Sequence, residues 1–215
     1  MTWVLLCDRE GMDWYRWEQR ELANTLRAVG PDAPTLCEGW RSRHLAAHLY
    51  LRLHRPGQFL AGLLPGLTDA GTRTMELGEA HADPEAYEGL LDRFLAEPAA
   101  WNPMALAGDA IHLLEYVVHH EDVRRADGPV QPRNLAPEQL STLWVQVRRA
   151  GRTTQARDRT GMVLVVPGGP RAVVCRARHS IAVTGDPVEL ALYLTGRTEH
   201  ADVDVVAVAA QQPTL

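Results

Sequence analysis

The sequence predicts an α+β protein, with a helical bundle over residues 1–150 and a small α+β domain over residues 151–215. Stretches of good helix formers that end at proline or glycine fill the first part. Short β-branched runs separated by turn residues begin after Gly151, which is typical of strands. A chain of 215 residues is long enough to bury a sizeable core.

The first part contains five segments with the composition and terminal residues of helices. They cover residues 10–29, 42–54, 83–97, 110–127 and 137–150. Ser42 is a suitable N-cap for the second segment, and Asp83 with Pro84 begins the third. Residues 57–82 mix Gly, Thr and Pro with leucines, so we expect a loop and a short helix there.

The second part combines strands with one helix. The predicted strands cover residues 162–166, 172–175, 180–183 and 202–209. The helix begins after Asp186, a suitable N-cap, and Glu189 is placed to complete a capping box. The PGGP run at residues 167–170 is a turn, because no Lys-Ser/Thr pair follows it as in a phosphate-binding loop.

Composition and charge exclude several classes of function. The net charge is −5 and no basic patch interleaves with aromatic residues, so we expect no nucleic-acid partner. No run approaches the ~18 apolar residues of a membrane-spanning helix, and we expect neither a membrane partner nor a signal segment. The three cysteines are scattered, which favours a reducing compartment over a disulfide framework. We therefore expect a cytoplasmic protein.

The segment over residues 110–126 concentrates the groups that bind metals. Glu115 and His119 are four residues apart, so they lie on one face of a helix and reach a common point. Helical bundles add ligands from facing helices, and His48 is available on the helix over residues 42–54. Three protein ligands and one open position are the pattern of a catalytic zinc site. The sequence thus predicts that His48, Glu115 and His119 bind a divalent metal.

Other histidines leave the ligand set open. His112 lies one turn before the carboxylate, and His44 forms an H-x-x-x-H pair with His48, so either is an alternative ligand. His120 points about 100° away from His119 and is not expected to share its ion. A histidine on an apolar helix face is also often a hydrogen-bonded core residue without a metal.

The charged neighbours of the predicted ligands have two interpretations. Glu115 and His119 could simply face solvent or pair with Arg124 and Arg125, and either case would leave no metal site. Glu121 and Asp122 could orient a ligand imidazole through its second nitrogen. Cys37 is a candidate nucleophile, but no base is placed beside it and we expect a small buried side chain.

Three short motifs together resemble a known family. They are LCEGW at residues 36–40, LAAHL at residues 45–49 and EYVVHHEDVRR at residues 115–125. They are similar to an actinobacterial metal-binding family of the DinB-like four-helix-bundle superfamily, whose members are similar to the mycothiol-dependent maleylpyruvate isomerase. The run TGDPVELALYLTGR at residues 184–197 resembles the second domain of that isomerase. The resemblance therefore spans both predicted parts in order.

The resemblance implies zinc on the residues that match the family motif, which are His48, Glu115 and His119. It also implies an active-site arginine from the C-terminal domain, for which Arg197 is the nearest candidate. The family tends to have Asp where this chain has His44, so we expect a different polar environment around the site.

These observations lead to three hypotheses. The first is a zinc-dependent (or other divalent-metal-dependent) enzyme that uses a low-molecular-weight thiol, such as mycothiol, for isomerisation or thiol transfer on a small electrophile. In that enzyme Arg52 or Arg197 would hold an anionic substrate. The second is a non-catalytic metal-binding or ligand-sensing protein. The third is a bundle whose core histidines bind no metal.

Overall fold

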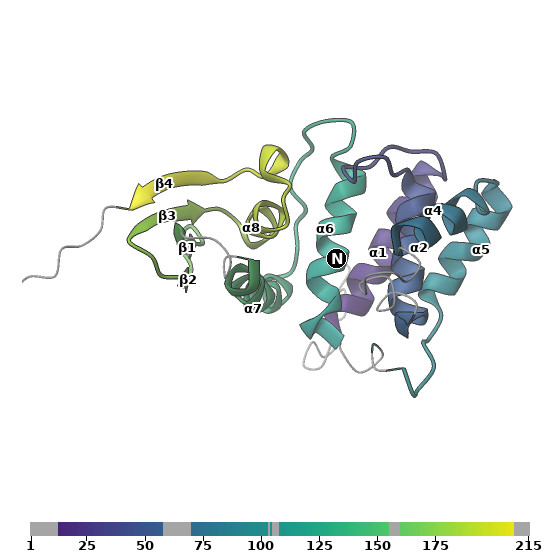
Figure 1. Ribbon diagram of the computed structural model, residues 1–215, viewed down its shortest axis with the longest axis horizontal. Helices are drawn as coiled ribbons and strands as arrows, with labels where there is room; N and C mark the ends of the chain where they lie inside the picture. The colour runs from purple at the N-terminus through teal and green to yellow at the C-terminus, as the bar shows by residue number, and fades with distance from the viewer. Residues whose placement is uncertain (1–12, 58–69, 103, 105–107, 155–159, 209–215) are drawn as a thin grey trace, which may run out of the picture.

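The computed structural model describes residues 13–57, 70–102, 104, 108–154 and 160–208. Figure 1 shows the helices from α1 (Trp14–Val29) to α6 (His112–Arg124) grouped on one side and a small sheet on the other, with α7 (Pro137–Thr154) and α8 (Pro187–Leu194) between them. The predicted α+β class is confirmed. Within the described ranges, no helix has both the length and the apolar character needed to span a membrane.

The described helices agree with the predicted segments to within a few residues. They are α1 (Trp14–Val29), α2 (Ser42–His54), α4 (Ala70–Glu79), α5 (Pro84–Leu95), α6 (His112–Arg124), α7 (Pro137–Thr154) and α8 (Pro187–Leu194), with short 3-10 turns η2 (Gly108–Ala110) and η4 (Thr198–His200). The predicted start of the first helix, at residue 10, lies outside the described residues. The central helix starts two residues later than predicted, after η2. The short helix expected within residues 57–82 is α4.

The start of α2 corrects one prediction. Ser42 is the first residue of the helix, and Arg41, in extended backbone, is the N-cap. The backbone N–H of Arg41 donates to Nδ1 of His44 at 3.0 Å. The Ser42 hydroxyl donates instead to the carbonyl of Gly30. An imidazole three residues into the helix thus satisfies the cap in the way that Glu or Gln does in a capping box.

Two other predicted caps are confirmed. The carboxylate of Asp83 accepts from two backbone N–H groups at the start of α5, and that of Asp186 from one at the start of α8. Glu189 does not complete a capping box on α8, contrary to the prediction. It accepts two hydrogen bonds from Arg125 of α6, at 2.9 and 2.7 Å.

The sheet is mixed, with the strand order β2-β1-β3-β4. Its strands are β1 (Thr160–Val165), β2 (Arg171–Cys175), β3 (His179–Thr184) and β4 (Asp204–Val208). β1 and β2 form an antiparallel pair joined by the predicted turn, where Gly168 has a positive φ of 65°. β3 pairs parallel to β1 and antiparallel to β4. All four predicted strands are therefore present.

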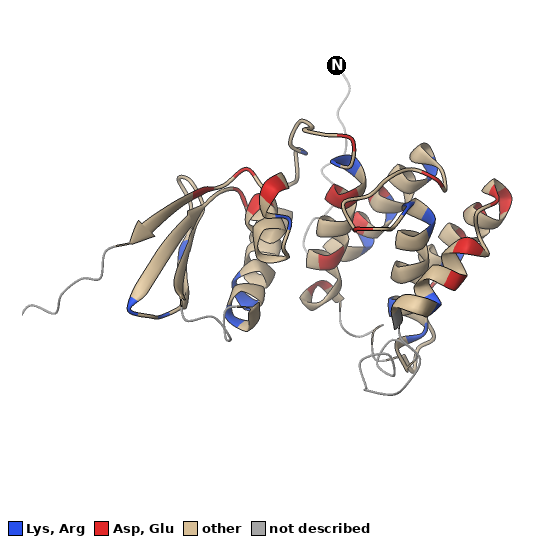
Figure 2. Ribbon diagram, turned by 45° about the horizontal axis from the view of Figure 1, so that its top comes forward, with Lys and Arg blue, Asp and Glu red and all other residues tan. Residues whose placement is uncertain are grey.

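Helices α7 and α8 join the sheet to the bundle. α7 packs against α8 and β2 and also contacts α6, while α8 contacts α6 directly. Leu190 and Leu192 of α8 are fully buried. Acidic and basic segments both occur at the junction between α8 and α6 (Figure 2). The predicted domain boundary at residue 150 falls inside α7 and stays a prediction.

Candidate metal centre

Three predicted ligands converge between α2 and α6. His48 comes from α2, and Glu115 and His119 come from successive turns of α6. Their ligand atoms all lie within 4.8 Å of one another, and Nε2 of His48 is 3.5 Å from Oε1 of Glu115. Two ligands of a tetrahedral ion with bonds near 2.0–2.1 Å are roughly 3.3 Å apart. The observed separation is therefore close to that of two ligands of one ion.

The trio formed by His48, Glu115 and His119 contains one carboxylate oxygen that makes no hydrogen bond within the described part of the chain. Oε2 of Glu115 is buried and has no hydrogen-bond partner among the described residues. Buried carboxylate oxygens are normally hydrogen-bonded or bound to a metal, because an unsatisfied one is costly. The rings of His48 and His119 meet edge to face with their centroids 5.3 Å apart, next to this carboxylate. The residues present therefore fit a divalent cation.

The protonation states also suit metal binding. Burial lowers the pKa of His48, which favours the neutral imidazole. Burial alone would raise the pKa of Glu115, but the hydrogen bond from His48 and the charge of Arg52 lower it. Neutral imidazole and ionised carboxylate are the forms that coordinate metals. Nε of Arg52, one turn after His48 on α2, contacts Oε1 of Glu115, so this arginine lies at the edge of the trio.

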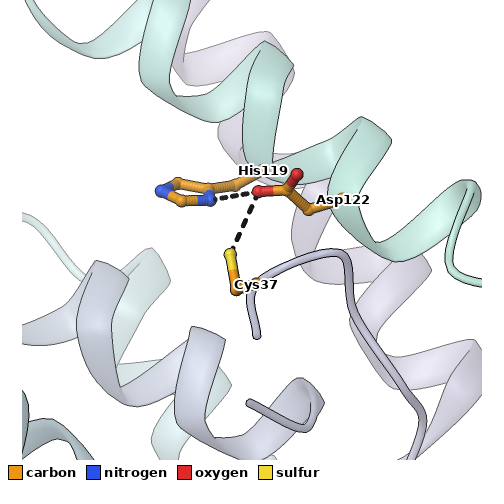
Figure 3. A group of neighbouring side chains, drawn as sticks. All are labelled: Cys37, His119 and Asp122. Carbon is orange, nitrogen blue, oxygen red and sulfur yellow. Dashed lines mark hydrogen bonds and ion pairs between the residues drawn. The ribbon is translucent and has the colours of Figure 1, made fainter. Parts of the chain in front are cut away.

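Asp122 forms a hydrogen bond with the His119 ring. Its Oδ2 accepts from Nδ1 of His119 at 2.9 Å, and its side chain is completely buried. Figure 3 shows Nε2 of the same ring pointing away from Asp122. Metal-binding histidines commonly donate their second N–H to a carboxylate in this way.

Arg197 also reaches this carboxylate. Its Nε donates to Oδ1 of Asp122 at 2.9 Å and its Nη2 to Oδ2 at 2.6 Å. A third donor group, Nη1, binds the carbonyl of Thr195 at 2.7 Å, near the end of α8. Burial alone would raise the pKa of Asp122, but hydrogen bonds from His119 and Arg197 lower it to about 2. Arg197 thus lies beside the predicted site and contacts Asp122.

Cys37 completes a second group of potential ligands. Its Sγ donates to Oδ2 of Asp122 at 3.2 Å, and Cys37, His119 and Asp122 bring their ligand atoms within 4.8 Å of one another (Figure 3). Nη2 of Arg197 lies 3.6 Å from the sulfur, so a cationic group already occupies this neighbourhood. Burial, followed by the negative charge of Asp122, raises the pKa of the Cys37 thiol to about 12. This thiol is protonated at neutral pH, which disfavours the nucleophile hypothesis.

The alternative histidine ligands have other roles. Nε2 of His44 contacts Glu79 at 2.8 Å while its Nδ1 accepts from the backbone N–H at the N-cap of α2, so both of its ring nitrogens are engaged.

The other two histidines also have partners outside the trio. Nε2 of His112 contacts the carbonyl of Met104 at 2.9 Å. His120 lies between Glu18 and Thr25, at 2.8 and 2.7 Å. None of the three histidines belongs to a group of converging ligand atoms in the described part of the chain.

The arginines of α6 do not compete for the predicted ligands. Arg124 and Arg125 both pair with Glu121, at 2.8 and 2.7 Å. The alternative in which they pair with Glu115 and His119 is therefore wrong. Arg133 also donates to Glu121, so three arginines engage this carboxylate, and Asp122 is the one that contacts the imidazole of the predicted ligand His119.

The fold has known relatives among solved structures. One is a crystal structure of the mycothiol-dependent maleylpyruvate isomerase, with a TM-score of 0.59 and 19% sequence identity. Another is a variant of that isomerase with one histidine replaced by alanine, with a TM-score of 0.58 and 18% identity. Each covers 93% of this chain and 92% of the other. Comparisons with protein-family models and with curated proteins give no match.

This chain shares the fold of that isomerase. The match covers nearly the whole chain, so it includes both the bundle and the part with the sheet. The fold that the sequence motifs implied is therefore confirmed. At 19% identity the likeness concerns the fold alone.

The sequence did not reveal how the loop before α2 meets the site. The backbone N–H of Leu36 donates to the carbonyl of Asp122 at 2.9 Å, which fixes this loop against α6. The Trp40 ring lies 5.1 Å from the His48 ring, measured between centroids. The LCEGW motif at residues 36–40 indicated that this loop matters, but the motif alone does not predict that the loop contacts α6.

A cavity of about 470 Å³ opens beside Arg197. The loop before α2 contributes Cys37 and Glu38 to its wall, and the segment after α8 contributes Thr195, Arg197 and His200. Its lining is mainly polar, and its volume falls within the range of small-molecule sites.

Proposed function

We propose that this protein is a divalent-metal-dependent enzyme that uses a low-molecular-weight thiol, such as mycothiol, to isomerise a small electrophile or to transfer the thiol to it. The observation that carries the proposal is the convergence of His48, Glu115 and His119 around a buried carboxylate oxygen with no described partner. The fold supports it, because the isomerase that shares the fold depends on mycothiol.

The donor set suits zinc and several other divalent ions. Two imidazoles and one carboxylate form an open site of the kind found in catalytic zinc enzymes, and the same set also suits iron. A bound divalent ion would supply Lewis acidity and lower the pKa of a coordinated thiol, so that the thiol binds as a thiolate. His48, Glu115 and His119 would hold this ion.

Two arginines provide positive charge near the trio. Arg52 contacts the ligand carboxylate, and Arg197 borders the polar cavity. Guanidinium groups bind carboxylates with good geometry, so these positions favour an anionic electrophile. We propose that Arg52 orients such a substrate. Arg197 would supply positive charge at the boundary between the site and the cavity.

Both reactions need only the thiol and the electrophile as reactants. A thiolate adds to a conjugated double bond, forming a carbon–sulfur bond and moving the π electrons onto the conjugated carbonyl. Rotation about the resulting single bond, followed by return of the π electrons and expulsion of the thiolate, re-forms the double bond in the other geometry and regenerates the thiolate. In thiol transfer a leaving group departs with its electron pair instead.

The test begins with the metal content of protein purified without added metal. We expect about one equivalent in the wild type and its loss in His48→Ala and His119→Ala, with the fold retained. His54→Ala is a matched control, because His54 lies on the same helix as His48 and contacts the carbonyl of Phe94 instead. Wild-type protein that neither contains nor takes up a divalent ion would refute the proposal.

The second stage asks whether the metal-loaded protein is catalytic. Thiols, including mycothiol, are paired with unsaturated carbonyl acids and with electrophiles that carry a leaving group. Turnover that needs both thiol and metal supports the enzyme. Metal binding without turnover for any pair would support the non-catalytic metal-binding or ligand-sensing alternative.

A further inference from the structure

A chain of direct contacts runs from the segment after α8 to the predicted metal site. Arg197 donates two hydrogen bonds to Asp122, one to each carboxylate oxygen, at 2.9 and 2.6 Å. Asp122 accepts from Nδ1 of His119 at 2.9 Å. Arg197 and Asp122 are 75 residues apart in sequence, so only the folded protein joins them.

We propose that Asp122 and Arg197 are positioning residues that fix the tautomer and the ring orientation of His119, and that they thereby couple the C-terminal part of the chain to metal affinity. This inference rests on the proposed metal site. It differs from a role for Arg197 in binding substrate, because it acts through Asp122.

The contact with Asp122 selects one form of the imidazole. A carboxylate oxygen only accepts hydrogen bonds, so Nδ1 of His119 carries the proton and Nε2 keeps its lone pair. Nε2 is the nitrogen that points away from Asp122 in Figure 3, and His119 is also a member of the converging trio. Without Asp122, the ring would lose the partner that holds it in this tautomer.

Arg197 fixes Asp122 in turn. A guanidinium that binds both oxygens restricts rotation of the carboxylate and balances its charge. This matters because the Asp122 side chain is completely buried, where a carboxylate without a cationic partner is costly. The bond from Nη1 of Arg197 to Thr195 anchors the guanidinium to the end of α8.

The same cluster has a second interpretation as a separate metal site formed by Cys37, His119 and Asp122. Nη2 of Arg197 lies 2.6 Å from the shared oxygen of Asp122 and 3.6 Å from the sulfur of Cys37. The arginine therefore supplies the positive charge that a second ion would bring. The geometry favours one ion in the trio and a guanidinium beside Asp122.

The experiment measures zinc affinity by competition with a chromophoric chelator, together with the visible spectrum of the cobalt-substituted protein. Changes in groups that orient a ligand commonly weaken metal binding by about 10- to 100-fold, and we expect such a loss for Asp122→Asn. We expect a smaller loss, on the order of tenfold, for Arg197→Gln and partial recovery in Arg197→Lys. The cobalt spectrum should change in the same order.

A double variant tests whether the two residues act in series. If Arg197 acts through Asp122, adding Arg197→Gln to Asp122→Asn weakens metal binding no further. Arg125→Gln is the matched control, because Arg125 also links α6 to α8 but contacts Glu189. It should lower stability without changing the zinc affinity or the cobalt spectrum.

The outcomes separate this inference from the proposed function. Wild-type affinity in both Asp122→Asn and Arg197→Gln would overturn the inference and leave the metal site intact. Equal loss of affinity in Arg197→Gln and Arg125→Gln would also overturn it, because the effect would then be structural. If Asp122→Asn does not fold, the inference requires a higher zinc affinity in Arg197→Lys than in Arg197→Gln, and equal affinities would overturn it. A wild type that binds no metal overturns both proposals.

Discussion

Arg52 and His48 approach the same oxygen of Glu115. Nε of Arg52 contacts Oε1, and Nε2 of His48 lies 3.5 Å from it, while Oε2 of this carboxylate is buried with no hydrogen-bond partner among the described residues. The carboxylate is thus held from one side and unsatisfied on the other. This arrangement makes Glu115 the residue whose alteration is most informative.

We predict that Glu115→Gln lowers affinity for a divalent ion by more than about 100-fold, since the loss of a direct ligand should exceed the loss of a group that orients one. A neutral amide keeps the shape but lacks the charge that attracts the ion. Isothermal titration with zinc measures the effect. Glu85→Gln, on the exposed start of α5, serves as the control. Unchanged affinity in Glu115→Gln would remove this carboxylate from the ligand set.

Arg52 gives a prediction about substrate binding. If it orients an anionic electrophile, Arg52→Met should raise KM by roughly 10- to 100-fold, because hydrogen bonds to charged groups contribute about 1.5–3 kcal/mol. The metal content should stay near one equivalent and kcat should change less than KM. Steady-state kinetics on an acid and on its methyl ester measure this, and the ester serves as the control. An equal effect on both substrates would contradict a role in charge recognition.

A separate buried cluster predicts how stability depends on pH. Burial alone would raise the pKa of Glu18, but hydrogen bonds and charges of His120 and Arg133 lower it below 4.5. A depressed folded-state pKa means that this contribution is full above the unfolded value near 4.5 and is lost as the pH falls through the folded value. Urea unfolding between pH 3 and pH 7 should show this loss in the wild type. In Glu18→Gln the decline below about pH 4.5 should be shallower; an identical decline would contradict the assignment.

The sequence predicted local relationships better than distant ones. Glu115 and His119 lie four residues apart on one helix, so their convergence follows from helix geometry alone. His48 was predicted as the third ligand because helical bundles add ligands from facing helices, and the helix over residues 42–54 offered it, with His44 as the alternative. Helical spacing also placed Asp122 near a ligand imidazole, but it left Glu121 as an equal candidate until the partners of Arg125 were known.

Tertiary packing determines the remaining contacts. The hydrogen bonds of Asp122 with Cys37 and Arg197 join residues 85 and 75 positions apart. No local pattern reports such contacts, because they depend on how α8 and the loop before α2 pack on α6. The cap of α2 was mispredicted for a related reason, since the Ser42 hydroxyl binds a carbonyl twelve residues away.

The Arg125–Glu189 pair provides the last prediction, which concerns the junction between α6 and α8. Both side chains are about nine-tenths buried, and the guanidinium binds both carboxylate oxygens. Glu189→Leu removes both of these hydrogen bonds but leaves Arg125 paired with Glu121, so it should cost about 1.5–3 kcal/mol in the free energy of unfolding. Combined with Arg125→Met, it should cost less than the sum of the two single effects, because Arg125→Met alone leaves the buried Glu189 carboxylate without the cation that pairs with it, whereas the double variant does not.

Chemical denaturation of the two single variants and the double variant measures this coupling. Arg27→Met provides the comparison, because Arg27 pairs with Glu88 and Asp92 at an exposed surface, where such pairs contribute about 1 kcal/mol or less. If the double variant is destabilised by the full sum of the single effects, the two residues do not act as a pair. The stability of the junction would then come from the apolar contacts of α8, such as those of Leu190 and Leu192.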